Sequence, residues 1–225
     1  MDTHTDGPGL QRARGFISVG HDEYWTREMY DNAIEARDAG VNFAFLCGNS
    51  VFGVVPLLPS AEGQANRIIR RVGVFVGEKG YAELDEQLKQ QIAARIGNYP
   101  PGPDGALLMG GRMGRDCLGG GDWVCSKPAH WLYHGTGMKE GVMVKGLIGW
   151  EWHGEPAMDL PGMERLASVT PVNPKTGKPK TPHAATIYDG PKGTVVFNAG
   201  TIWWAQGLSS PPGHVLPAHK AARPQ

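Results

Sequence analysis

The clearest alternation of apolar and polar positions lies between residues 15 and 47. Residues 15–20 (GFISVG) are a short apolar run bounded by glycines, which indicates a buried strand. Residues 26–40 repeat apolar side chains every three or four positions, which predicts a helix that Thr26 caps and Gly40 ends. Residues 41–47 (VNFAFLC) are a second apolar run. A strand, a helix and a strand in this order predict a βαβ unit with two parallel strands.

The pattern is weaker along the rest of the chain. Glycine and proline are frequent from residue 97 to residue 121, which predicts a long loop there. Shorter apolar or amphipathic segments predict one or two strands in residues 67–77, a helix over residues 81–96, and strands over residues 142–149 and 194–198.

These elements predict the domain organisation. We expect a single α/β domain of catalytic type over residues 1–208, with a long loop insertion around residues 55–125. Its fold would be a three-layer α/β sandwich around a mainly parallel sheet. Residues 209–225 have the composition of a disordered tail.

The net charge and the hydropathy of the chain argue against nucleic acids and membranes as partners. The 225 residues include 22 Lys or Arg and 22 Asp or Glu, so the formal net charge is zero. A neutral chain lacks the positive surface that a nucleic-acid backbone or an anionic membrane would attract. No run of 18 apolar residues is present and the N-terminus lacks the layout of a signal peptide. We therefore expect no nucleic acid, no membrane and, by default, a cytoplasmic location.

Chemically capable side chains follow both strands of the βαβ unit. His21, Asp22, Glu23 and Tyr24 come directly after the first strand, and the segment 47–50 (CGNS) follows the second. The carboxyl ends of adjacent parallel strands meet at one edge of a sheet, where ligands bind in open α/β sheets. The sequence therefore predicts a functional site at this edge, although such a loop taken alone fits a purely structural role equally well.

Several of these motifs resemble a known family. The segments GHDEYW and DAGVNFAFLCGN resemble the C-terminal catalytic domain of the N,N-dimethylformamidase large subunit and its relatives. The resemblance resumes in PAHWLYHGTGMKEG, LIGWEWHGEP and GTVVFNAGTIWWAQGL, and spans most of residues 10–208. It implies a class I glutamine-amidotransferase-like (flavodoxin-like) fold and a hydrolase that cleaves a small amide, or a related ester, with a metal-activated water.

The same resemblance implies a mononuclear iron as cofactor, held by two tyrosines and a glutamate. Tyr24 of GHDEYW matches the first tyrosine and Glu151 of GWEWHG matches the glutamate. Phe52 stands where the second tyrosine is expected, and its side chain has no oxygen to bind a metal. Phenolate and carboxylate oxygens suit ferric iron, which lowers the pKa of bound water. His21, Asp22 or His153 would then have to complete the ligand set.

The expected chemistry assigns roles to the neighbouring side chains. His21 or Glu23 would move the proton, and Asn49 would donate to the developing oxyanion. We expect Phe52, Trp150 and Asn198 to contact the substrate.

The same residues are also compatible with other mechanisms and with a non-catalytic role. Cys47 or Ser50 would be the nucleophile of a cysteine- or serine-dependent amidase or esterase, although FLCGNS lacks the glycine before the cysteine of the amidotransferase turn. Cys117 and Cys125 would form a disulfide, remain free thiols, or join two histidines on zinc. A degenerate domain that binds a ligand without catalysis would also lose a metal ligand, as Phe52 does.

The expected partners are few. They are a small amide or ester substrate and either a second copy of the chain or an additional N-terminal region, because relatives carry a substantial segment upstream.

Overall fold

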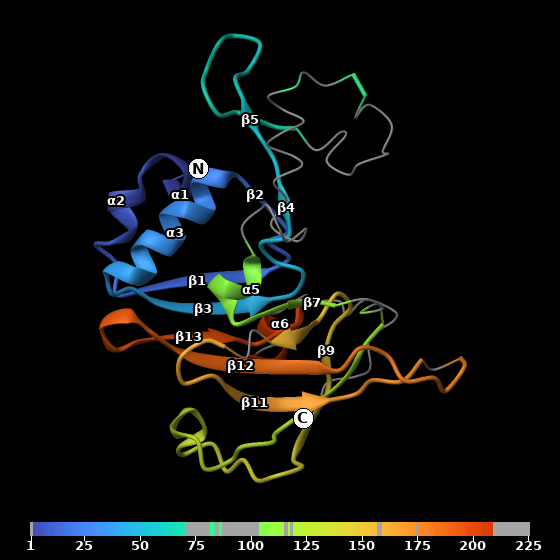
Figure 1. Cartoon of the computed structure of the whole chain (residues 1–225). Helices are drawn as coiled ribbons and strands as arrows, with labels where there is room; N and C mark the ends of the chain where they lie inside the picture. Colours follow the sequence, from blue (N-terminus) through green and yellow to red (C-terminus); the bar gives the residue numbers. More distant parts are fainter. Residues whose placement is uncertain are drawn as a thin grey trace.

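The computed structural model describes residues 2–70, 82–83, 86, 104–114, 117, 119–156, 159–173 and 175–208. Its centre is a five-stranded mixed sheet in the order β1-β3-β13-β12-β11 (Figure 1). These strands are β1 (Gly15–Gly20), β3 (Asn42–Cys47), β13 (Thr194–Asn198), β12 (His183–Gly190) and β11 (Glu164–Val169).

The predicted βαβ unit is confirmed. β1 and β3 pair in parallel, with Gly15 opposite Asn42 and Gly20 opposite Cys47. Helix α3 (Arg27–Ala39) connects them, and the Thr26 hydroxyl accepts a hydrogen bond from the Met29 N–H at 3.1 Å. Gly40 ends the helix in the left-handed region at φ 114°, which a residue with a side chain rarely adopts.

The predicted mainly parallel, three-layer, class I glutamine-amidotransferase-like sandwich is wrong. β13 pairs with β3 in parallel, but β12 pairs antiparallel with both β13 and β11. The short turn Pro191–Gly193 joins β12 to β13, and so short a link cannot make the crossover that parallel strands require. The first βαβ unit predicts parallel pairing, but the strands in the second half of the sheet pair antiparallel.

Small elements surround this sheet. In the described part of the chain, two-stranded sheets pair β2 (Tyr24–Trp25) with β4 (Gly53–Val54), β5 (Leu57–Leu58) with β6 (Ile68–Ile69), β7 (Gly111–Met113) with β10 (His153–Pro156), and β8 (Gly121–Val124) with β9 (Met143–Ile148). The short helices are α1 (Asp2–Thr5), α2 (Gly7–Leu10), α5 (Gly105–Met109) and α6 (Trp204–Leu208), with 3-10 turns η1 (Trp131–Tyr133) and η2 (Pro191–Gly193).

The other predicted elements have mixed outcomes. The strands expected over residues 142–149 and 194–198 are confirmed as β9 and β13. The loop expected over residues 97–121 contains α5 and β7, so that prediction is wrong in part. Most of the helix expected over residues 81–96, the end of the strand region at residues 67–77, and the tail at residues 209–225 lie outside the described residues.

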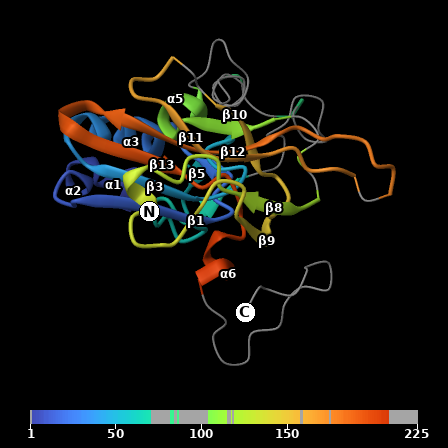
Figure 2. The same ribbon diagram turned by 90° about the horizontal axis from the view of Figure 1, so that it is seen from below.

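Two apolar layers cover the two faces of the sheet (Figure 2). On one face α3 and α5 pack on β1, β3, β13 and β12 through side chains such as Ala33, Phe45 and Val196. On the other face β8, β9 and α6 pack on β13, β12 and β11, with Trp123 and Phe197 in the layer. Among the described residues, no helix has both the length and the apolar character needed to span a membrane.

Candidate active site

The loops that follow β1 and β3 lie side by side. The N–H of Val51 donates to the Asp22 carbonyl at 3.0 Å, and the N–H of Phe52 donates to the Glu23 carbonyl at 3.0 Å. Tyr24 then pairs with Gly53 in the short parallel ladder of β2 and β4. The segment 21–24 and the segment 49–53 therefore form one surface at the carboxyl ends of the two strands.

Two carboxylates converge on one imidazole at this surface. His21 Nε2 lies 3.0 Å from Glu151 Oε2 and 3.3 Å from Glu23 Oε2. The side chain of His21 is 33% exposed, whereas those of Glu23 and Glu151 are 18% and 17% exposed. Trp150 packs edge-on against His21 with ring centroids 6.2 Å apart, and is itself partly exposed to solvent. The cluster is thus enclosed on the protein side and open at His21.

The carboxyl of Glu151 has a raised pKa at this site. Burial raises the pKa of its carboxyl above the ordinary value; His21 and a hydrogen bond from Asn49 act to lower it, and the charge of Glu23 acts to raise it. Glu151 Oε2 is buried and, among the described residues, accepts no hydrogen bond of good geometry, although His21 lies beside it. A carboxylate oxygen in this state is available to accept a proton from a bound molecule.

The backbone at this surface is strained. Asn49, Val51 and Glu151 have φ angles of 46°, 52° and 59°, in the left-handed region that glycine prefers. Such conformations cost of the order of 1–3 kcal/mol each and persist only where the surrounding structure enforces them. Gly48 provides one such constraint, because a Cβ at this position would lie 2.9 Å from the Glu151 carbonyl oxygen and 2.6 Å from Ile202.

The buried His153 holds the strained turn at residues 49–51 through a hydrogen bond to its backbone. The Ser50 N–H donates to His153 Nε2 at 3.3 Å, so His153 carries its proton on Nδ1 and donates it to Asn198 Oδ1 at 2.9 Å. Burial lowers the pKa of His153 to about 4, which keeps the ring neutral near pH 7. Asn198 is fully buried and also accepts from the Gly200 N–H at 3.0 Å.

A buried hydroxyl fixes the segment that carries Glu151. Thr201 Oγ1 donates to the Leu147 carbonyl at 2.7 Å and accepts from the Gly149 N–H at 2.8 Å and the Trp203 N–H at 3.1 Å. The end of β9, just before Trp150 and Glu151, is therefore tied to the loop after β13. Glu151 therefore owes its position to β9 and to the loop after β13, both of which lie outside the predicted βαβ unit.

Cys47 does not have the environment of a nucleophile. Its thiol is buried and lies 3.7 Å from the Ser18 hydroxyl, and burial raises its pKa to about 12. Thiols react as thiolates, so a thiol with this pKa is inert near pH 7. Ser50 is also buried, and the nearby His153 Nε2 is occupied by the Ser50 N–H. The structure records Cys47, Cys117 and Cys125 as free cysteines.

The iron ligand set that the resemblance implies is incomplete in this chain. Tyr24 and Glu151 carry suitable oxygen atoms, but Phe52 has none, and the bonds of its loop to Glu23 place it on the site surface. Within the described ranges, no group of three or more His, Cys, Asp or Glu side chains is arranged to hold a metal ion. His21 contacts Glu23 and Glu151 directly. The residues present therefore do not fit a tyrosine–tyrosine–glutamate iron site.

The sequence did not predict the positioning roles of three residues at this site. His153 was considered only as a metal ligand, and Thr201 and Gly48 were not singled out. Each is buried or acts through one close backbone contact, so apolar periodicity gives no signal for it. The signal that existed was local: Thr201 and Asn198 belong to FNAGT, and His153 to GWEWHG.

The fold and this cluster define a mixed α/β domain with a carboxylate–imidazole site at a sheet edge. The chain belongs to the family described as "N,N-dimethylformamidase beta subunit-like, C-terminal", which matches residues 1–219. The resemblance seen in the sequence is thereby confirmed. No curated protein matches the chain.

Proposed function

We propose that this domain is an amide hydrolase in which Glu151 activates a water molecule. The observation that carries this proposal is the buried Glu151 Oε2, which lies 3.0 Å from His21 Nε2 but accepts no hydrogen bond of good geometry among the described residues. Family membership supports hydrolysis of an amide at a coarse level, because the family is named for an amidase. The substrate would be a small amide, or a chemically related ester.

The proposed reaction needs one base and one acid. Glu151 takes a proton from water as the water oxygen attacks the amide carbonyl carbon, and a raised carboxyl pKa makes Glu151 a stronger base. The C–N bond then breaks, and the amine nitrogen receives a proton from Nε2 of His21 in its imidazolium form. The proton that Glu151 took from the water then passes to Nε2, which restores both groups for the next turnover. Glu23 holds His21 in place, since its carboxylate accepts from the same ring nitrogen.

The remaining predicted site residues receive different roles. Asn49 holds Glu151 through a hydrogen bond, and its other amide hydrogen would face the developing oxyanion. Trp150 and Phe52 would border the substrate, because Trp150 is partly exposed beside His21 and the loop of Phe52 is bonded to Glu23. Asn198 is fully buried, so we assign it to positioning the strained turn through His153 and not to substrate contact.

Iron has no step in this proposal, because the donor set is incomplete at Phe52. Tyr24 and Glu151 would be the two residues to contribute oxygen ligands if a metal were bound, and such an ion would polarise the amide carbonyl. The cysteine or serine alternative is the less favoured one, since burial keeps the Cys47 thiol protonated and inaccessible.

Amine release from simple amides tests the proposal. The purified chain is offered tertiary, secondary and primary formamides and acetamides, and the matching esters, and the amine or alcohol is quantified. We expect release of amine, unaffected by prior alkylation of thiols, because Cys47 is buried. Activity that disappears on alkylation would instead support the cysteine mechanism, and binding of amides without turnover would support a non-catalytic domain.

A further inference from the structure

Strand β1 forms one edge of the central sheet. β1 ends the strand order, and its only partner strand in the described part of the chain is β3. The carbonyls of Arg14 and Gly20 face β3, where they accept from the N–H groups of Asn42 and Gly48, each at 3.2 Å. Because backbone groups alternate along a strand, the even-numbered residues face β3 and Gly15, Ile17 and Val19 present their N–H and C=O groups to the open side.

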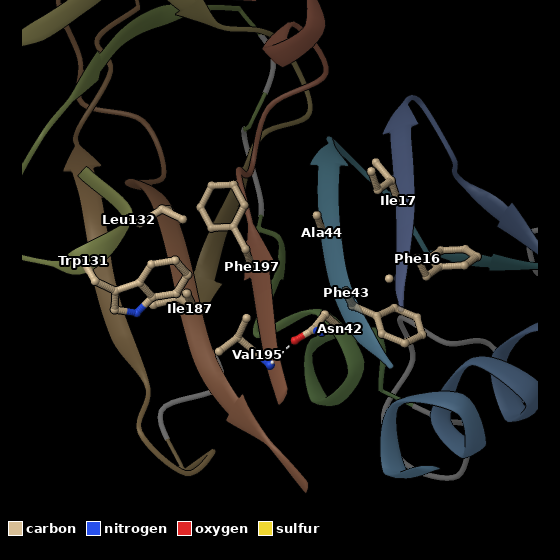
Figure 3. Close-up of a pocket in the computed structure, with 11 residues that line it drawn as sticks. Phe16, Ile17, Asn42, Phe43, Ala44, Trp131, Leu132, Ile187, Val195 and Phe197 are labelled. Atoms are coloured by element: carbon tan, nitrogen blue, oxygen red, sulfur yellow. Dashed lines mark hydrogen bonds between the residues drawn. The ribbon is translucent and has the colours of Figure 1, made fainter. Parts of the chain in front are cut away.

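The side chains at this edge are apolar and unprotected. Ile17 is 64% exposed and Val19 is 53% exposed, and Leu208 at the end of the neighbouring helix α6 is 72% exposed. Figure 3 shows Ile17 at one side of an apolar groove on this face of the sheet and Trp131 at the other. Residues 15–20 contain neither a charged residue nor proline, the usual devices that keep a sheet edge from pairing with another chain.

The flanks of β1 identify the strand that fits this edge. The exposed Arg12 precedes the strand, and the partly exposed Asp22, which accepts a hydrogen bond from the Ser18 hydroxyl, follows it. An antiparallel copy of β1 would therefore set Arg12 of each chain beside Asp22 of the other. With Ile17 opposite the partner's Ile17, Gly15 faces the partner's Val19, so the small residue accommodates the large one. Each of these three pairs would exchange two backbone hydrogen bonds.

We propose that the β1 edge is the interface of a two-fold symmetric dimer. The β1 strands of two copies pair antiparallel about Ile17 and join two five-stranded sheets into one continuous sheet. Helix α3 lies over β1 and β3 on one face of the sheet and does not run along the β1 edge (Figure 2). The interface is isologous and closed, because pairing consumes the β1 edge of both copies.

Light scattering and disulfide trapping on the intact chain test this interface. Wild type is expected to have twice the chain mass at tens of micromolar and to dissociate on dilution. Ile17→Lys and Val19→Pro should give a monomer with an unchanged circular dichroism spectrum, since one places a charge at the edge and the other removes an outward N–H. Val142→Lys, at an exposed apolar position just before β9, should leave the dimer intact.

Trapping also reports the register. Hydrogen-bonded antiparallel pairs have Cα atoms about 5.5 Å apart, within reach of a disulfide. Ile17→Cys should therefore cross-link under mild oxidation with copper phenanthroline, whereas Val19→Cys should not, because Val19 lies opposite the partner's Gly15. The native thiols at Cys47, Cys117 and Cys125 are buried and give a low background. A monomeric wild type, or equal cross-linking at both positions, overturns the proposal.

Discussion

Glu151→Gln is expected to reduce kcat/KM for amide hydrolysis by about 10²- to 10⁴-fold, the usual contribution of a general base. The glutamine amide keeps the shape of the side chain and still accepts the hydrogen bond from Asn49, but it cannot take a proton from water. The loss should fall on kcat more than on KM, because the interaction is made in the transition state. Steady-state kinetics with the best amide substrate measures it.

The stability of this variant separates a catalytic role from a structural one. A buried carboxyl with a raised pKa is destabilising when ionised, so Glu151→Gln should keep or raise the melting temperature at pH 7. Glu62→Gln removes a carboxylate from a fully exposed position and should leave both activity and stability unchanged. A Glu151→Gln protein that melts several degrees lower with equal activity per folded molecule would contradict the assigned role.

Acid is expected to unfold the protein between pH 6.5 and pH 4 because of two buried histidines. Burial lowers the pKa of His153 and of His183 from 6.5 to about 4. Between pH 6.5 and about pH 4, the two histidines therefore bind protons in the unfolded chain but stay unprotonated in the native state. Each histidine alone removes about 3 kcal/mol of stability across this window. The stabilisation is complete above pH 6.5 and is lost as the pH falls.

Urea unfolding at a series of pH values measures this slope. His183→Gln should flatten it, since a neutral side chain at position 183 no longer couples folding to a proton. His134→Gln changes an exposed histidine and should leave the slope as in wild type. Asp22 and Glu151 act in the opposite direction. Burial raises their pKa values, so their protonation stabilises the native state as the pH falls. A free energy of unfolding that stays flat from pH 7 to pH 4 would show that His153 and His183 are not buried as neutral rings.

The part of the site that could be predicted from sequence is the part that local pattern determines. The strand, capped helix and strand from Gly15 to Cys47 lie as expected, and they bring Glu23 and Asn49 to one surface. Glu151 was reached only through the resemblance of its motif, because its approach to His21 depends on β9, β10 and the loop after β13. No periodicity in the sequence reports such long-range contacts.

The error in the fold has a similar cause. Strand β12 has the sequence HAATIYDG and is buried over most of its length. Its small and polar residues give no continuous apolar run, so the sequence pattern did not predict a strand there. A hairpin connection then made the second half of the sheet antiparallel. Thr201 was missed, and His153 was considered only as a metal ligand, because a buried polar side chain is recognised by its hydrogen-bond partners, and those partners lie 54 and 45 positions away in the chain.

Amide turnover after removal of metal ions tests the central claim most directly. The wild-type chain is dialysed against a strong chelator until iron and zinc fall far below one equivalent, and release of amine is compared before and after. Because the protein's own Glu151, His21 and Glu23 activate the water in this account, the rate should be unchanged. Activity that is lost on chelation and restored by ferric iron would contradict it.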